Sequence, residues 1–172
     1  MWTSIVVLSL AAMVGGSDHR TYPCAFAISD AGAPAQVLGP NEATSRASVM
    51  TQRDSPLAIV AADLSGVTVT AGSGSFERSG RHVLDVKNVS DQVITKARVT
   101  VMVGFGPGSG VGSGFRLQRP LAPGEQTRLE WNSGLGRGSE ATSESVSVVV
   151  LVEEVQMSGC LYRPSQTWPN SR

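Results

Sequence analysis

The chain has 172 residues, of which 41% are hydrophobic, and its 14 Lys and Arg residues balance its 14 Asp and Glu residues. This length and composition are typical of one globular domain with a single core plus a targeting segment. A balanced charge creates no field that would concentrate a polyanion at the surface, so we expect no nucleic-acid partner.

The N-terminal residues 1–17 predict a secretory signal peptide. An apolar run from Ile5 to Val14 is followed by the small residues Gly15, Gly16 and Ser17, which is the pattern of a cleavable export signal. The run is shorter than the roughly 20 residues that a membrane-spanning helix needs. We therefore expect a secreted or periplasmic protein with no stable membrane span after cleavage. The alternative is a buried N-terminal strand or helix.

Two cysteines, Cys24 and Cys160, remain after this cleavage. In an oxidising compartment such a pair is expected to form a disulfide. The alternative, two ligands of a soft metal, lacks nearby His or further Cys. The disulfide would pin an N-terminal arm, residues 18–56, to the end of the last strand. The arm is rich in Ala, Ser, Gly, Pro and Thr, so we expect it to be mostly irregular with one helical turn near Asn41 to Met50.

Beyond the arm, short apolar runs with a period of two predict strands. They cover residues 57–61, 67–71, 81–89, 93–105, 112–118, 126–131 and 144–157. In the fourth strand one face is expected to be core and the other, with Lys96, Arg98 and Thr100, to face solvent; the core face is Val93, Thr95, Ala97, Val99, Val101 and Val103. Val149 and Leu151 indicate that the last strand is buried on both sides. Residues 57–163 thus predict an antiparallel β-sandwich, all-β, of about seven strands, followed by a C-terminal tail, residues 164–172.

A spacing of polar and apolar residues resembles that of bacterial extracytoplasmic immunoglobulin-like modules, including the FxLYD type. It comprises Asn88-Val89-Ser90, Ile94, the alternation Val99-x-Val101-x-Val103, and Leu121-Ala122-Pro123-Gly124-Glu125, within residues 81–131. The resemblance implies an immunoglobulin-like β-sandwich that acts in binding, spacing or assembly. It supplies no catalytic residue.

Templates for catalysis find little support. The sequence has no Gly-x-Ser-x-Gly, Ser-x-x-Lys or His-Glu-x-x-His motif. His82 is interpreted as a strand-edge histidine near solvent. Glu153 and Glu154 are adjacent on a strand and point to opposite faces, and the surroundings of Asp85 and Asp91 hold too few oxygen ligands for calcium. Asn88-Val89-Ser90 is formally a glycosylation acceptor, but a role in a turn is preferred. We expect no catalytic residue, metal or cofactor.

The stretch GFGPGSGVGSG, residues 104–114, is the candidate interaction surface. Its glycines lack the spacing of a dinucleotide fingerprint, and a strand rather than a helix follows. Pro107 cannot lie inside a central strand, so the chain should turn there and form a hairpin whose outward face carries glycines. This is either a flexible loop or a bare backbone surface for a partner. The candidate residues are Gly104, Phe105, Gly106, Pro107, Gly108, Ser109, Gly110, Val111 and Gly112, together with Trp168, which either docks a partner or lies back on the domain.

The leading hypothesis is an exported, non-enzymatic β-sandwich module for protein–protein interaction or for envelope or surface assembly. Its partner would be a protein or a glycan at the cell envelope. The rival hypothesis is a small secreted hydrolase with a site near His82 and a serine of the glycine-rich loops.

Overall fold

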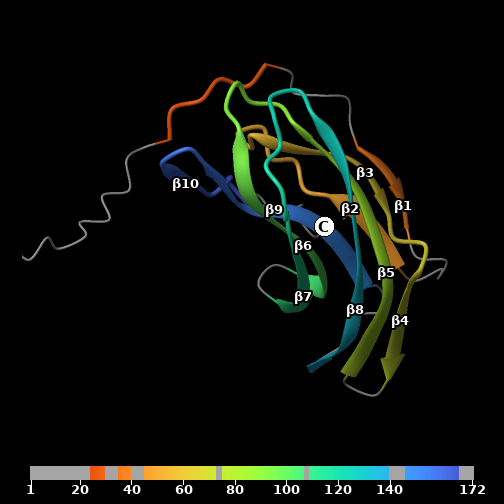
Figure 1. Cartoon of the computed structure of the whole chain (residues 1–172). Coiled ribbons are helices and arrows are strands. Elements are labelled where there is room, and N and C mark those ends of the chain that lie inside the picture. Colours follow the sequence, from red (N-terminus) through yellow and green to blue (C-terminus); the bar gives the residue numbers. More distant parts are fainter. Residues whose placement is uncertain are drawn as a thin grey trace, which may run out of the picture.

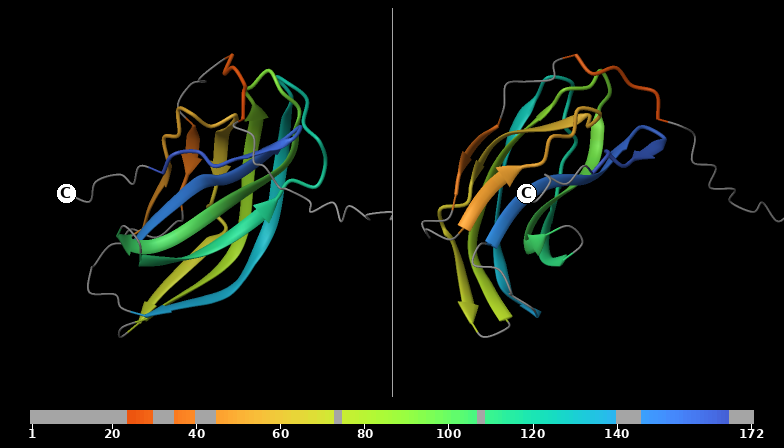
Figure 2. Two further views of the ribbon diagram at one scale, coloured as in Figure 1. Left: turned by 90° about the vertical axis from the view of Figure 1, so that its left-hand side faces the viewer. Right: turned by 180° about the vertical axis from the view of Figure 1, so that it is seen from behind.

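The computed structural model describes residues 24–29, 35–39, 45–72, 75–106, 109–139 and 146–166. Within these ranges the chain forms ten strands in two sheets that lie face to face (Figures 1 and 2). The all-β prediction is therefore confirmed for the described part of the chain. The predicted signal peptide and the end of the tail from residue 167 lie outside the described residues.

The first sheet is built around the long strand β5 (Ser75–Asn88). Along one edge of β5 runs β8 (Gln126–Ser139), antiparallel to it. On the other edge, β3 (Leu57–Asp63) pairs with the C-terminal half of β5 and β4 (Val67–Gly72) with the N-terminal half, both antiparallel. The short strand β1 (Gln36–Leu38) pairs parallel with β3. Strands β3 and β4 thus lie end to end along β5, like one strand with a break.

The break between β3 and β4 is a turn at residues 64–66. Asp63 Oδ1 closes it by accepting hydrogen bonds from the Ser65 amide at 3.0 Å and from the Ser65 hydroxyl at 2.6 Å. Opposite the turn, Gly80 of β5 has φ 143°, and a Cβ atom there would lie against the carbonyl oxygen of Gly66. Only glycine permits this close approach. It allows β5 to stay paired on both sides of the break.

The second sheet has β9 (Val146–Met157) and β6 (Ile94–Gly106) at its centre, antiparallel to each other. Beyond β6 lies the edge strand β7 (Ser109–Arg116), also antiparallel. The other edge of β9 is shared by two short strands, β2 (Ser45–Val49), which is parallel, and β10 (Cys160–Tyr162), which is antiparallel. Figure 2 shows the second sheet covering one face of the first.

The structure corrects two expectations for the arm. The sandwich is mixed rather than purely antiparallel, because β1 and β2 both pair parallel with their neighbours. The arm is not mostly irregular, since β1 and β2 belong to it, and strand β2 lies where a helical turn was predicted. Ala47 and Val49 of β2 pack against the core. The backbone of β9 supplies the hydrogen-bond partners of β2, and a strand of three to five residues is too short to be recognised from its own sequence.

Two of the predicted strands are much longer than expected. Strand β5 begins at Ser75 instead of Arg81, and β8 continues to Ser139 instead of ending at Trp131. The added segments are rich in glycine and serine, so they carry no apolar alternation. They pair with each other, for example Phe76 with Gly138. Their strand conformation is therefore stabilised by this pairing and not by an alternating apolar pattern.

The core lies between the sheets and is formed by alternate side chains of the central strands. On β6 the valines 99, 101 and 103 point inward as predicted, and on β9 both faces are buried at Val149 and Leu151, also as predicted. The predicted face of β6 is wrong at its start, where Val93 is 42% exposed and Ile94 is buried instead. The reason is a β-bulge between Ile94 and Lys96, which shifts the alternation by one residue.

Candidate functional site

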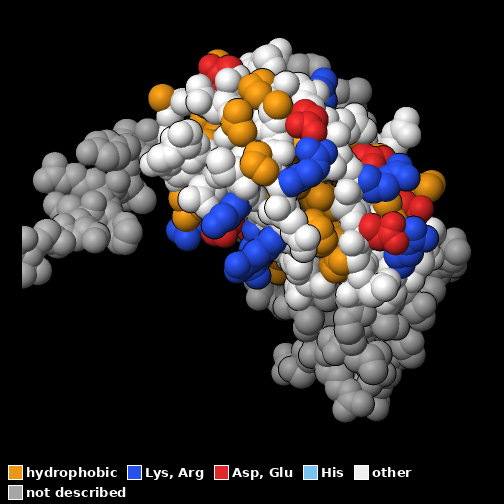
Figure 3. Space-filling model, in the orientation of Figure 1, with side chains coloured by type: hydrophobic (Ala, Val, Ile, Leu, Met, Phe, Trp, Pro, Cys, Tyr) orange, Lys and Arg blue, Asp and Glu red, His pale blue; other side chains and the backbone are white. Residues whose placement is uncertain are grey.

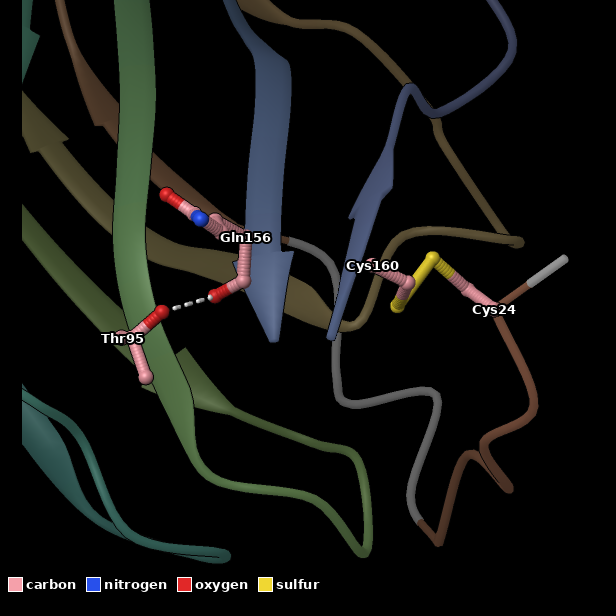
Figure 4. The surroundings of a disulfide bond; sticks show 4 residues. All are labelled: Cys24, Thr95, Gln156 and Cys160. Atoms are coloured by element: carbon pink, nitrogen blue, oxygen red, sulfur yellow. Dashed lines mark hydrogen bonds between the residues drawn. A yellow bond between two sulfur atoms is a disulfide. The ribbon is translucent and has the colours of Figure 1, made fainter. Parts of the chain in front are cut away.

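A disulfide ties the arm to the sandwich, as the sequence predicted. Cys24 and Cys160 are bonded, with Cα atoms 5.4 Å apart (Figure 4). Beside it, the Thr95 hydroxyl of β6 donates to the Gln156 carbonyl oxygen of β9 at 3.0 Å (Figure 4). Both thiols are consumed, which removes the soft-metal alternative. In the described part of the chain, no group of three metal-ligating side chains comes together.

The arm and the C-terminal segment are also joined by polar contacts around Asp54. Its carboxylate accepts hydrogen bonds from the Ser165 hydroxyl at 2.7 Å, the Ser165 amide at 2.8 Å and the Tyr162 hydroxyl at 2.9 Å. Burial raises the pKa of Asp54, but the bonds from Ser165 and Tyr162 together outweigh it, and the pKa lies below its ordinary value. Gln52 extends the contact by bonding both the amide and the carbonyl of Val152.

Asn88 is a buried structural residue and not an accessible glycosylation acceptor. Its side chain is 0% exposed. Nδ2 donates to the carbonyl oxygens of Gln92 at 2.8 Å and Leu121 at 2.9 Å, while Oδ1 accepts from the amide of Ser90 at 3.0 Å and from its hydroxyl at 2.8 Å. These bonds tie the end of β5 to the start of β6 and to the loop before β8. The preferred turn role agrees with this arrangement.

His82 does not lie near solvent, contrary to our expectation, because it is 0% exposed in the core. Its ring centroid lies 4.9 Å from that of Trp131, its neighbour on β8, which lies 5.3 Å from Phe115 of β7. Trp131 Nε1 also donates to Ser113 Oγ at 3.1 Å. The alternation of His82 with Leu84 and Val86 was the signal that could have placed it inside.

These contacts form a seam that closes the sandwich where the edge strands β7 and β8 meet. The seam consists of His82, Ser113, Phe115 and Trp131. A serine and the histidine of the rival hydrolase therefore do lie in one region, but Trp131 stands between the imidazole and the Ser113 hydroxyl. A substrate could reach His82 only if the seam opened.

The glycine-rich stretch forms a hairpin, as predicted. Strands β6 and β7 pair across it from Arg98 with Arg116 to Gly106 with Ser109. On β7, Ser113 and Phe115 point inward while Gly112 and Gly114 are exposed. Of the other candidates, residues 104–106 and 109–111 are described for their backbone alone, and Pro107, Gly108 and Trp168 lie outside the described residues.

Thr100 and Gly114 are neighbours on the outer face of this hairpin. A Cβ atom at Gly114 would lie 3.1 Å from both Thr100 Oγ1 and Arg98 Nε. Thr100 is only 3% exposed, although we expected it to face solvent, and its hydroxyl has no hydrogen-bond partner among the described residues. This burial could not be predicted from the sequence, because it depends on neighbours from two other strands.

The outer face of the first sheet carries ion pairs between neighbouring strands. Arg128 forms a two-pronged ion pair with Asp85, and Arg81 pairs with Glu130 at 2.7 Å. The hydrogen bond from Arg128 lowers the pKa of Asp85. In Figure 3, positive and negative side chains adjoin one another on the side of β5 and β8. Among the side chains that the structure describes here, these charges are paired and solvated.

The comparisons with known proteins add no relative. No protein family, curated protein or solved structure matches the chain significantly. The described residues also include no helix of the length and hydrophobicity required to cross a membrane.

Proposed function

We propose that this chain is an exported, non-enzymatic binding module that recognises a protein partner at the cell envelope or surface. The observation that carries the proposal is the edge strand β7, which displays bare backbone at Gly112 and Gly114 while Ser113 and Phe115 anchor it to the interior. Two successive outward positions without side chains let another chain approach the backbone closely there. Because the anchors fix the strand, such a surface can be rigid enough to recognise a partner.

The fold we propose for this module is immunoglobulin-like. In support, three long stretches, β3–β4, β5 and β8, form one layer and β7, β6 and β9 form the other. The chain crosses between the layers from β5 to β6, from β7 to β8 and from β8 to β9, as in a Greek-key sandwich. The parallel strands β1 and β2 are then additions from the arm to the two layers.

Export is supported by the disulfide. The bond between Cys24 and Cys160 forms and persists in oxidising compartments. It agrees with the signal peptide expected at residues 1–17. The rival, a secreted hydrolase, is disfavoured because His82 is enclosed behind Trp131.

A position-specific crosslink tests the proposal. The photoreactive residue benzoylphenylalanine replaces exposed Arg116 on the outer face of β7 or, as a matched control, exposed Arg128 on the outer face of β8. The chain is expressed with its N-terminal segment in the organism that encodes it. We expect a discrete adduct with an envelope protein from position 116 and none from position 128. Equal labelling from both positions, or no adduct from position 116, would refute β7 as the working surface.

A further inference from the structure

His82 is the only ionisable side chain in the described part of the chain that is fully buried. It is 0% exposed, whereas every Asp, Glu, Lys and Arg side chain described there keeps contact with solvent. An imidazole in water gains a proton at about pH 6.5, within the range in which proteins use histidine as a pH sensor. Burial disfavours the charged form, because the charge loses its hydration in an apolar core. The stability of the core around His82 is therefore coupled to pH.

The described charges of the surrounding strands point away from the imidazole. On the first sheet the outer face carries Asp63, Arg81, Asp85, Lys87, Arg128 and Glu130. On the second sheet the outer face carries Lys96, Arg98, Arg116, Glu153 and Glu154. The described side chains of β6, β7 and β9 that point inward are apolar apart from Ser113. A proton on His82 would thus place a positive charge among apolar groups.

The seam beside His82 is closed by side chains and not by a ladder of backbone hydrogen bonds. Among the described strands, β7 pairs with β6 and β8 pairs with β5. Trp131 joins the two edge strands, since its ring centroid lies 5.3 Å from that of Phe115 and its Nε1 donates to Ser113 Oγ at 3.1 Å. The same ring lies against His82, with centroids 4.9 Å apart. The seam can therefore open by a movement of edge strands that leaves both sheets paired.

On its other edge, the segment of β5 that carries His82 meets the turn between β3 and β4. Asp63 of β3 pairs with Val83 and Val67 of β4 pairs with Gly80, so the residues between these two pairs face the turn at residues 64–66. The ladder that supports His82 is therefore the one with β8, in which it pairs with Trp131. Local opening costs least where few backbone hydrogen bonds must break. The position of His82 beside the turn thus favours opening at the seam.

We propose that His82 is an acid-sensitive latch, and that its protonation opens the seam between β7 and β8. Above about pH 7.5 the imidazole is neutral whether the seam is open or closed, so the seam is fully stable. As the pH falls below about 6.5, the open form binds a proton that the closed form excludes, and the stability of the closed seam is lost. The seam holds β7 through Ser113 and Phe115, so opening frees this strand. The inference goes beyond the proposed function and concerns the chain alone.

Hydrogen exchange of the Trp131 indole N–H, followed by NMR on the disulfide-bonded chain, tests the latch. In the closed seam this N–H is bonded to Ser113, so exchange requires opening. The chain is compared at pH 7.5 and pH 5.0, above the range near pH 4 in which carboxylic acids titrate in water. One proton that binds to the open form alone raises the opening constant about 30-fold between these two values. The protection factor of the indole, corrected for its intrinsic exchange rate, should fall by the same factor.

Variants and a second probe separate the latch from general effects of acid. His82→Phe keeps a ring at this position but cannot bind a proton, so its indole protection should be the same at both pH values. His19→Gln replaces the only other histidine of the chain and should keep the full response. The Leu151 amide, at the centre of β9, reports unfolding of the whole domain and should be protected at least tenfold more than the Trp131 indole at either pH. If His82→Phe fails to fold, the ring C–H signals of the parent decide, and we expect His82 to stay neutral in the closed chain at pH 5.0.

Each alternative outcome overturns the inference. An unchanged protection factor of the parent at pH 5.0, or the parent's acid response in His82→Phe, would show that His82 does not control the seam. Equal protection of the Trp131 indole and the Leu151 amide would show that acid acts through unfolding of the whole domain. A protonated His82 ring in the closed chain at pH 5.0 would show that the core accepts the charge. None of these results depends on a partner, so the crosslink from position 116 remains a separate test of the proposed function.

Discussion

Replacing Asn88 by Ala should remove the bonds that join β5, β6 and the loop before β8. The side chain is enclosed, and both of its polar atoms are used by groups of Ser90, Gln92 and Leu121. Alanine has the same backbone freedom in a strand but no donor or acceptor. The change therefore measures the hydrogen bonds of this junction with little disturbance of the backbone.

The size of the effect follows from which groups keep a partner. The Leu121 carbonyl still accepts from the Ile94 amide at 3.0 Å, and the Gln92 carbonyl still accepts from the Ser90 hydroxyl at 3.1 Å. The Ser90 amide, which is buried, loses its acceptor. The Ser90 hydroxyl keeps an acceptor, so the net loss is the two bonds donated by Asn88 Nδ2, at about 1 kcal/mol each, and the orphaned Ser90 amide, at about 1–3 kcal/mol. The free energy of unfolding should therefore fall by about 3–5 kcal/mol.

Urea unfolding followed by circular dichroism measures this loss. A typical domain has a free energy of unfolding of about 5–15 kcal/mol, so the midpoint should move down by about 2 M with an unchanged slope. The control is Asn132→Ala, an exposed asparagine on β8, which should change stability by no more than about 0.5 kcal/mol. A loss at position 88 no greater than at position 132 would refute the reasoning, as would a glycan on Asn88 of the folded chain.

Two further predictions concern the bonds between the ends of the chain. Replacing Cys24 and Cys160 by Ala frees a loop with a sequence separation of 136 and should lower the free energy of unfolding by about 5 kcal/mol in the chain-entropy treatment; a change below about 1 kcal/mol in urea would contradict it. The depressed pKa of Asp54 means that its contribution is present above pH 4 and is lost as the pH falls through the lowered pKa. Asp54→Asn should therefore destabilise the chain at pH 7 and much less at pH 2, and equal losses at both would contradict the role of the carboxylate.

The sequence could predict the central strands because their signal is local. The valines of β6 and β9 alternate over many residues, and the burial of both faces of β9 follows from Val149 and Leu151 lying between the other valines. The disulfide was predictable because two cysteines allow a single intramolecular pairing. The hairpin between β6 and β7 was predictable because Pro107 interrupts a continuous period of two.

Other features were hidden because they depend on distant partners. Strands β1, β2 and β10 are too short to carry a period, and their hydrogen bonds come from β3 and β9. The bulge after Ile94 places Ile94 in the core and leaves Val93 exposed, the reverse of what we predicted. The apolar pattern of one strand does not reveal such a register shift against β9. The orphaned hydroxyl of Thr100 is visible only when the surrounding strands are in place.

The arm that joins both sheets has a consequence for how the chain is made. Cys24, Gln52 and Asp54 have their partners at Cys160, Val152 and Ser165, separated by 136, 100 and 111 residues. The arm therefore cannot complete these contacts until the residues up to Ser165 have been synthesised. Until then the thiol of Cys24 has no partner within the chain. The disulfide can therefore form only after β10 has been synthesised, and a chain that ended before β9 would keep the Cys24 thiol unpaired within the chain.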